Sequence, residues 1–348
     1  MVKAKQHRLV AIGGGGGVSQ VILGARPYFE ELTAVVAVTD TGRSTGVARL
    51  IGDIPAPGDL RSTLANLAPD PEALWPKLLQ HRFHTQLLPE LDGMAFGNLL
   101  IAALTQLTGD FAQALALTAE LVGQTAQVLP VSTANTQLCA ELADGQIVEQ
   151  EFAVRGLQKA PIKRLFLAAS TAQAYPPVLA AIEAADLVVL GPGSLFTSVL
   201  ASLLFHGIVG ALQQTKAQVV FVCNTTTQPG QTDGFSLLEH LRQMVAMLGP
   251  GTLDYALINH SPELPAPLIA AYAQEGLILL QPKAAELAQI AAWGVKPIVA
   301  DFVEVTANKR ILWAKADTLR HQPALVGQTL WQILVAQNGE TEADCVHK

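Results

Sequence analysis

The sequence predicts an α/β protein with a mostly parallel β-sheet covered by helices on both faces, a helical insertion and an antiparallel edge. Half of the residues are hydrophobic and only 5% are aromatic, so aliphatic side chains must form the core. Short apolar strands alternate with helices from residue 164 to residue 280, which is typical of parallel strands joined by helical crossovers. Glycine-rich or polar loops follow several strands, which indicates a binding site at the carboxyl ends of the sheet.

The first two predicted strands both end in loops of unusual composition. Residues 8–12 form an apolar strand, residues 13–17 a glycine loop and residues 18–25 a helix. A second strand at 33–38 runs into the polar loop 39–46. The two loops are expected on the same edge of the sheet, because parallel strands end on one side.

Residues 58–124 show helical periodicity and are interpreted as a helical insertion. Helix starts are expected at Asp59 and at Asp70, and Gly109 followed by Asp110 separates two further helices.

The rest of the chain returns to strands. Residues 127–131, 137–142 and 147–154 are expected strands, and Asp144 with Gly145 joins the last two in a hairpin. Strands are then expected at 164–168, 187–190, 218–223, 254–258 and 277–280, and they alternate with helices at 173–184, 194–213, 234–247 and 264–275. A hairpin of 302–306 with 310–315 and a closing helix at 323–337 follow. We expect one α/β domain over residues 1–338 and a polar tail over 339–348.

Composition excludes several classes of protein. A formal net charge of −7 opposes binding to nucleic acid. The three cysteines are widely spaced and offer no disulfide framework or zinc motif. His81 and His84 have no carboxylate or cysteine at helical spacing, so no metal site is expected there. No apolar run is long enough for a signal peptide or a membrane span, which predicts a cytoplasmic protein without membrane contact.

The first glycine loop indicates an anion site. Five glycines follow a strand and precede a helix, where free N–H groups and the helix dipole attract phosphate. The alternative is a flexible turn without a ligand, but five glycines there have a high entropic cost in the folded chain. The loop does not fit the dinucleotide pattern G-x-G-x-x-G, because Val18 or Ser19 stands at the third glycine.

Two later strands also end in polar loops. The strand at 187–190 leads to Gly191, Pro192, Gly193 and Ser194 at the start of a helix, with Thr197 and Ser198 one turn on. Ser194 is expected to cap this helix, and an ordinary capped junction is the alternative to a second anion site. The lysine of a nucleotide-hydrolysing P-loop is missing. After the strand at 218–223, Asn224, Thr227 and Gln228 are suited to contacts with a base or a sugar.

Charged and amide side chains between these loops complete the predicted site. Asp40 ends a strand and is expected to accept from a ribose hydroxyl or to hold a magnesium-bound phosphate. Asp59 has an equal alternative as a plain N-cap, and Arg61 can pair with Asp59 or with phosphate.

These ordered motifs resemble the gluconeogenesis factor family (YvcK-like), which is related to the 2-phospho-L-lactate transferases (CofD-like). The resemblance covers roughly residues 8–335 and rests on the motifs just described together with Gly97-Asn98-Leu99-Leu100 and the loop from Thr227 to Gly234. It implies a Rossmann-like sheet, a homodimer, and a non-catalytic UDP-sugar-binding protein that affects carbon metabolism, cell shape and cell-wall synthesis. The alternative that it implies is an enzyme that transfers a phospholactyl group to a deazaflavin with Mg²⁺.

The sequence departs from that family in four places along the chain. Thr41 stands where the family has a second aspartate, Arg43 lies in a usual run of glycine and serine, Gly16 replaces a common threonine, and Gln231 replaces the usual glutamate. The loss of a carboxylate weakens a divalent-metal site, so these changes favour binding over transfer. Arg320 in Arg320-His321-Gln322 is similar to an Arg-His-Asp motif that the family associates with nucleotide-sugar binding.

The predicted ligand is a nucleotide or nucleotide sugar. No catalytic residue and no protein metal site are assigned, no cofactor is required, and Mg²⁺ is allowed beside a nucleoside diphosphate ligand. The candidate ligand-binding residues are Gly13, Gly14, Gly15, Gly16, Gly17, Ser19, Asp40, Arg43, Ser44, Asp59, Arg61, Asn98, Gly191, Gly193, Ser194, Thr197, Ser198, Asn224, Thr227, Gln228 and Arg320.

Overall fold

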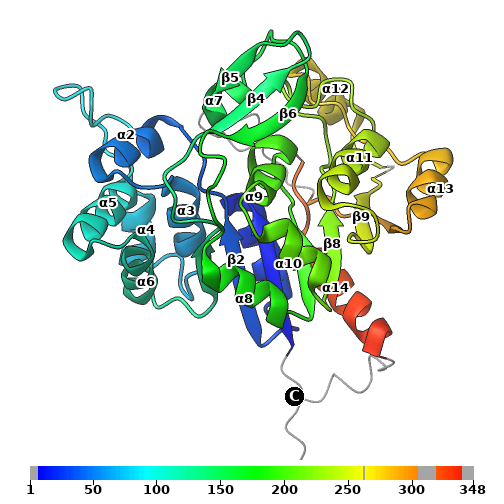
Figure 1. Cartoon of the computed structure of the whole chain (residues 1–348), viewed down its shortest axis with the longest axis horizontal. Coiled ribbons are helices and arrows are strands. Elements are labelled where there is room, and N and C mark those ends of the chain that lie inside the picture. The colour runs from blue at the N-terminus through cyan, green and yellow to red at the C-terminus, as the bar shows by residue number, and fades with distance from the viewer. Residues whose placement is uncertain (1–6, 262, 305–318, 339–348) are drawn as a thin grey trace, which may run out of the picture.

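A seven-stranded parallel sheet forms the centre of the protein (Figure 1). The computed structural model describes residues 7–261, 263–304 and 319–338. The strand order across the sheet is β10-β9-β8-β7-β1-β2-β3, and every neighbouring pair is parallel. The strands are β1 (Arg8–Gly13), β2 (Glu31–Val36), β3 (Gln127–Pro130), β7 (Leu187–Leu190), β8 (Gln218–Val222), β9 (Tyr255–Asn259) and β10 (Lys296–Ala300). The predicted α/β class and parallel sheet are confirmed.

The strand order reverses direction between β1 and β7. From β1 the chain moves outward to β2 and β3, whereas from β7 it moves the other way to β8, β9 and β10. Right-handed crossovers then put the helices of the two halves on opposite faces of the sheet. The carboxyl ends of β1 and β7 therefore flank a topological switch point, where open α/β sheets bind their ligands.

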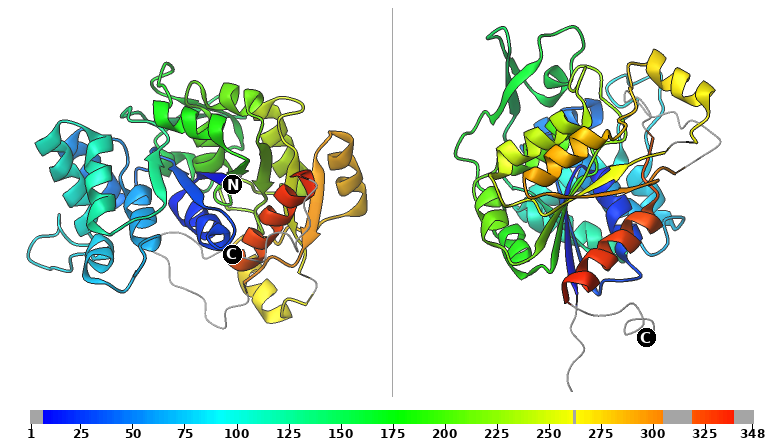
Figure 2. Two further views of the ribbon diagram at one scale, coloured as in Figure 1. Left: turned by 90° about the horizontal axis from the view of Figure 1, so that it is seen from below. Right: turned by 90° about the vertical axis from the view of Figure 1, so that its right-hand side faces the viewer.

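Helices cover both faces, so the central strands are apolar along their whole length. All of β7 and the last five residues of β1 are buried. The helices of the sheet region are α1 (Gly15–Ala25), α8 (Pro176–Ala184), the π-helix η1 (Leu195–Leu200), α9 (Ala201–Leu203), α10 (Ile208–Gln214), α11 (Leu237–Leu248), α12 (Ala266–Gln274), α13 (Ala284–Ala292) and α14 (Pro323–Asn338). The predicted closing helix is present as α14, which packs along α1 (Figure 2).

A cluster of helices lies to one side of the sheet (Figure 1). It consists of α2 (Arg43–Gly52), α3 (Gly58–Asn66), α4 (Leu74–Gln80), α5 (Phe96–Thr108) and α6 (Phe111–Leu121). Gly109 and Asp110 separate α5 from α6 as predicted, and Asp110 also caps α6, since its carboxylate accepts from the N–H groups of Ala112 at 2.7 Å and Gln113 at 3.0 Å. The two predicted helix starts are wrong: Pro57 is the N-cap of α3 without a side-chain bond from Asp59, and α4 starts four residues after Asp70.

Residues 39–42 form a loop as predicted, but residues 43–46 belong to the start of α2. This helix begins at Arg43, and a buried arginine holds it in position. The guanidinium of Arg49 donates to the carbonyl oxygen of Thr136 at 2.7 Å and to the side chain of Asn135 at 2.8 Å. The local sequence, rich in glycine and hydroxyl residues, gives little helix signal, so this tertiary anchor decides the conformation.

The antiparallel strands form a separate three-stranded sheet and not an edge of the main one. Its order is β5 (Ile147–Glu149), β4 (Leu138–Leu142), β6 (Ile162–Leu167), and the β4–β5 hairpin is as predicted. Residues expected to continue β5 form the short helix α7 (Glu151–Val154), because Gln150 turns the chain with a φ of 74°. The small sheet stands over the carboxyl ends of β2 and β8 (Figure 1): the N–H of Phe152 donates to the Thr41 hydroxyl at 3.1 Å, and Lys159 donates to the carbonyl oxygen of Gly230.

Near the carboxyl terminus the helix α13 and the strand β10 were not predicted. The predicted strand at 277–280 is not part of the main sheet, but pairs with residues 225–227 through an isolated bridge between Thr226 and Leu279. Most of the hairpin predicted at 302–306 and 310–315, and the tail predicted at 339–348, lie outside the described residues.

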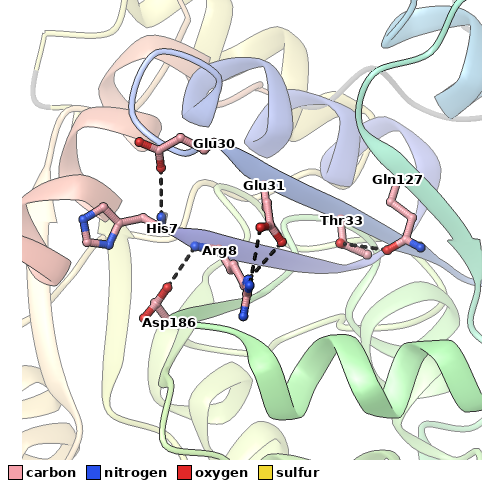
Figure 3. A network of polar contacts seen from close by, with 7 residues as sticks. All are labelled: His7, Arg8, Glu30, Glu31, Thr33, Gln127 and Asp186. Carbon is pink, nitrogen blue, oxygen red and sulfur yellow. Dashed lines mark hydrogen bonds and ion pairs between the residues drawn. The ribbon is translucent and has the colours of Figure 1, made fainter. Parts of the chain in front are cut away.

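At the opposite edge of the main sheet, where β1 and β2 begin, charged side chains form polar contacts (Figure 3). Arg8 pairs with Glu31 at 2.9 Å, while its backbone N–H donates to Asp186 at 2.9 Å. Exposed ion pairs of this kind contribute about 0–1 kcal/mol each to the free energy of unfolding. They join neighbouring strand ends and add little to stability. In the part of the chain that the structure describes, no helix is both long and apolar enough to cross a membrane.

Candidate functional site

The helix after β1 begins inside the run of glycines. Gly13 ends β1, Gly14 is the N-cap, and α1 starts at Gly15 in place of the predicted start at Val18. The first N–H groups of a helix have no intrahelical partner, and the helix dipole makes this end positive. The N–H groups at the predicted anion site therefore belong to a helical turn and not to a loop.

The second glycine loop packs directly against the first. A side chain at position 17 would put its Cβ 1.7 Å from the carbonyl oxygen of Pro192, and one at position 14 would put it 2.7 Å from Oγ of Ser198. A Cβ on Gly13 would lie 3.6 Å from the Cα of Gly191. The absence of side chains at these positions lets two backbone segments meet at the switch point.

Ser194 is not the side-chain cap that the sequence predicts. Its hydroxyl donates to Oε1 of Gln231 at 2.7 Å and accepts from Thr197 at 2.8 Å. These bonds connect the start of η1 with the loop after β8. The π-helix η1 was not predicted, and this conformation is frequent at functional sites. Gln231 was missed as a site residue, although its place in the polar loop after β8 could have indicated it.

The third loop meets the second through Asn224. The side-chain N–H of Asn224 donates to the carbonyl oxygen of Gly193 at 2.7 Å. Gln228 is fixed through its backbone N–H, which donates to the Thr232 hydroxyl at 2.7 Å, and the Thr227 hydroxyl donates to Gly276. The loops after β1, β7 and β8 therefore lie side by side at the carboxyl edge.

Two carboxylates border this arrangement from the side of β2 and α3. The Asp40 carboxylate follows β2 and accepts from the N–H of Gly42 at 2.8 Å and from the Thr45 hydroxyl at 3.4 Å. Oδ2 of Asp59 lies 3.4 Å from the position that a Cβ on Gly14 would occupy, so Asp59 faces the first glycine loop. The side chain of Arg43 lies outside the described residues.

Three predicted ligand contacts have internal roles instead. The Ser19 hydroxyl is buried and donates to the carbonyl oxygen of Gly15 at 2.6 Å, inside α1. The Ser44 hydroxyl accepts from the N–H of Ala95 at 2.8 Å and from the amide of Asn98 at 2.9 Å. This pair fastens α2 to the first turn of α5, because the hydroxyl meets an N–H group that the helix leaves free.

Arg61 belongs to the helical cluster and not to the glycine loops. It is buried, and its guanidinium donates to the carbonyl oxygen of Leu79 at 2.9 Å at the end of α4 and to the Ser62 hydroxyl at 2.9 Å. Burial, helped by the charge of Arg82 and opposed by Asp59, lowers its pKa to about 10. The predicted pairing with phosphate therefore finds no support in the position of this side chain.

Arg320 is held beside the carboxyl end of β8 by the residues around it. The Thr225 hydroxyl donates to the carbonyl oxygen of Leu319 at 2.7 Å, and the N–H of Glu304 donates to the carbonyl oxygen of Arg320 at 2.8 Å. The imidazole of His321 forms a hydrogen bond with the backbone of Cys223, the residue before Asn224. The backbone of a residue far away in sequence is thus brought to the end of β8.

His321 makes this anchoring dependent on pH. Burial lowers its pKa from 6.5 to about 4, against the opposing effect of its bond to Cys223. The neutral ring is therefore favoured in the folded state, and the stability that it contributes is complete above pH 6.5 and lost as the pH falls toward 4. We expect His321→Gln, which keeps an N–H donor but cannot titrate, to remove about 2 kcal/mol of the stability loss between pH 7 and pH 5. Urea unfolding at both pH values measures this difference, and identical acid losses in both proteins would contradict it.

Comparisons with known proteins agree on one family. The model of the family described as 2-phospho-L-lactate transferase CofD matches residues 9–303. The gluconeogenesis factor of Halalkalibacterium halodurans is 36% identical over 94% of this chain and 96% of its own length, and that of Bacillus subtilis is 33% identical over 95% and 99%. A crystal structure of a UPF0052 family member from Bacillus halodurans is similar with a TM-score of 0.85 and 35% identity, covering 94% of this chain and 99% of that one.

The family model covers most of the sheet, and the relatives match this chain over nearly their full lengths. The solved structure has the same fold at an identity that supports common ancestry. The chain belongs to the CofD-like family of gluconeogenesis factors.

Proposed function

We propose that this protein binds a nucleotide sugar, above all a UDP-sugar, and acts as a regulatory binding protein that affects carbon metabolism, cell shape and cell-wall synthesis. The observation that carries the proposal is the meeting of two glycine segments at the switch point between β1 and β7. The start of α1 supplies N–H donors, and Gly191 and Gly193 allow close approach of a diphosphate.

The side chains around this point suit the other parts of such a ligand. Arg320 at the end of β8 can form a bidentate contact with phosphate, and the Asp40 carboxylate can accept from a hydroxyl on the side of β2. Asn224 and Gln228 offer amides to a base or a sugar. A nucleoside diphosphate sugar combines these three chemistries in one molecule.

Two residues favour binding over transfer. Gln231 accepts the hydrogen bond of Ser194 where the family usually has glutamate, and an amide cannot take up a proton as a carboxylate does. Thr41 stands in place of an aspartate, which leaves one carboxylate fewer for a divalent cation. The second candidate function, transfer of a phospholactyl group to a deazaflavin, is supported by the name of the matching family model.

Calorimetry and a turnover assay test the proposal together. We expect UDP-glucose to bind the purified full chain, and incubation with guanylylated phospholactate and a deazaflavin to give no transfer above background with or without Mg²⁺. Measurable turnover would favour the transferase. Absence of binding for UDP, UDP-glucose, GDP and GTP would contradict a nucleotide-binding function.

The residues at the carboxyl edge offer a limited donor set for Mg²⁺. Both oxygens of Asp40 already accept hydrogen bonds, from Gly42 and from Thr45. Hard cations require charged oxygens, and the number of carboxylates tunes their affinity. A Mg²⁺ ion that enters with a nucleoside diphosphate would therefore depend mainly on the oxygens of the ligand.

Thr41→Asp should make ligand binding dependent on magnesium. The new carboxylate can accept from the N–H of Phe152, as the Thr41 hydroxyl does, and adds a second charge next to Asp40. We expect the affinity of the wild type for UDP to change less than about twofold between EDTA and Mg²⁺, and that of Thr41→Asp to change by about tenfold. Thr41→Asn is the uncharged control, and equal magnesium dependence in all three proteins would rule the explanation out.

A further inference from the structure

Hydroxyl groups alternate between two environments in the segment that follows β8. Thr225 and Thr227 are hydrogen-bonded within the protein. The Thr225 hydroxyl donates to the carbonyl oxygen of Leu319 at 2.7 Å, and the Thr227 hydroxyl donates to that of Gly276 at 3.2 Å. These two residues flank Thr226, which forms an isolated bridge with Leu279.

The other set of side chains has polar atoms without protein partners. Oδ1 of Asn224, Oγ1 of Thr226 and Oε1 of Gln228 are buried, and none of them has a hydrogen-bond partner among the described residues. Thr226 is 1% exposed. Buried polar atoms in folded proteins are nearly always hydrogen-bonded, so three such atoms within five residues indicate that this segment meets a polar group.

The amide of Asn224 shows where this polar group would lie and whether it must be a donor or an acceptor. Its Nδ2 donates to the carbonyl oxygen of Gly193 at 2.7 Å, which ties the segment to the second glycine loop. Because that bond requires the N–H of the amide, the atom that remains is the oxygen, an acceptor. The buried side-chain atom of Gln228 without a partner is also its carbonyl oxygen.

We propose that Asn224, Thr226 and Gln228 determine ligand specificity by accepting hydrogen bonds from donors that the ligand presents beside its phosphates. Two parts of a nucleotide sugar have such donors: the ring N–H of uracil or guanine, and the hydroxyl groups of the sugar. Cytosine, which has a ring nitrogen acceptor in place of the N–H of uracil, would meet an acceptor with that atom and lose the bond. This inference rests on the proposed nucleotide-sugar function and names the residues that select the ligand.

The test compares affinity ratios in variants of the full chain. Calorimetry gives the Kd of UDP, CDP and UDP-glucose for the wild type, Thr226→Val and Thr226→Ser. If the base is read, UDP binds the wild type about tenfold more tightly than CDP, and Thr226→Val removes most of this preference. If the sugar is read, Thr226→Val instead removes a preference of UDP-glucose over UDP. Serine keeps the hydroxyl and should retain the ratio that valine loses.

Thr225→Val is the matched control, because its hydroxyl lies in the same segment but is already bonded to Leu319. It should weaken all three ligands alike and leave the ratios unchanged. Gln228→Met, at a half-buried position, gives a second test if Thr226→Val does not fold. Ratios within twofold of the wild type in both Thr226→Val and Gln228→Met would overturn the specificity role alone, whereas a wild type that binds none of the ligands would contradict the proposed function as well.

Discussion

Gly17→Ala should unfold or strongly destabilise the site, with a loss of about 3 kcal/mol in the free energy of unfolding. A Cβ at this position would lie 1.7 Å from the carbonyl oxygen of Pro192 and 2.7 Å from its carbonyl carbon. Both atoms belong to backbone, so no side-chain rotation can relieve the overlap. The two glycine segments would have to separate, and nucleotide binding should be lost with them.

Gly16→Ala is the matched control for this substitution. Gly16 lies next to Gly17 in the same helical turn, but a Cβ there would have no atom within 4 Å. Alanine in a helix is more stable than glycine by about 1 kcal/mol, so this variant should be as stable as the wild type or more stable. Urea unfolding and UDP titration of both variants measure the difference. Equal stability of Gly16→Ala and Gly17→Ala would show that the two loops do not meet as described.

Arg320→Ala should weaken the binding of UDP-glucose by about tenfold or more. A guanidinium that forms two charge-assisted bonds with a diphosphate contributes roughly 1.5–3 kcal/mol. Lysine should restore only part of the affinity, because a point charge cannot replace the bidentate contact. Calorimetry on the wild type, Arg320→Ala and Arg320→Lys gives the three affinities, and unfolding midpoints check that the fold is retained.

A surface arginine without a ligand would behave differently. Its truncation would change stability and binding by no more than about 0.5 kcal/mol. Three equal affinities would therefore remove Arg320 from the site. The Thr225→Val variant connects this prediction with the proposed specificity of the segment after β8. The Thr225 hydroxyl holds Leu319, the residue before Arg320, at the end of β8.

Much of the fold follows from local patterns in the chain. The apolar strands at β1, β2, β7, β8 and β9 were predicted from sequence, because strands buried on both faces consist of continuous aliphatic residues. The strand β10 was missed, since Lys296 and Pro297 weaken the apolar pattern and most of its residues are partly exposed. The helix α2 was missed for a different reason: its buried Arg49 is held by Asn135 and Thr136, which lie far from the helix along the chain.

The candidate site also contains residues whose position could be predicted from the sequence and residues whose role could not. The glycine loops, Asp40 and Asn224 follow strands directly, so the rule that parallel strands end on one edge was enough to bring them together. The roles of Ser44, Asn98 and Arg61 could not be predicted, because a polar side chain near a site has the same sequence signal whether it meets a ligand or a helix end. Only the packing of α2, α4 and α5 decides between these partners.

The sequence by itself therefore determined the α/β class, the family and the glycine segments, all of which depend on neighbouring residues or on ordered motifs. The tertiary structure decided the strand order, the position of the switch point between β1 and β7, and the contact between Gly17 and Pro192. It also decided which hydroxyls after β8 are bonded within the protein. These features join residues that are distant along the chain, and the free energy that selects them arises only when the elements pack together.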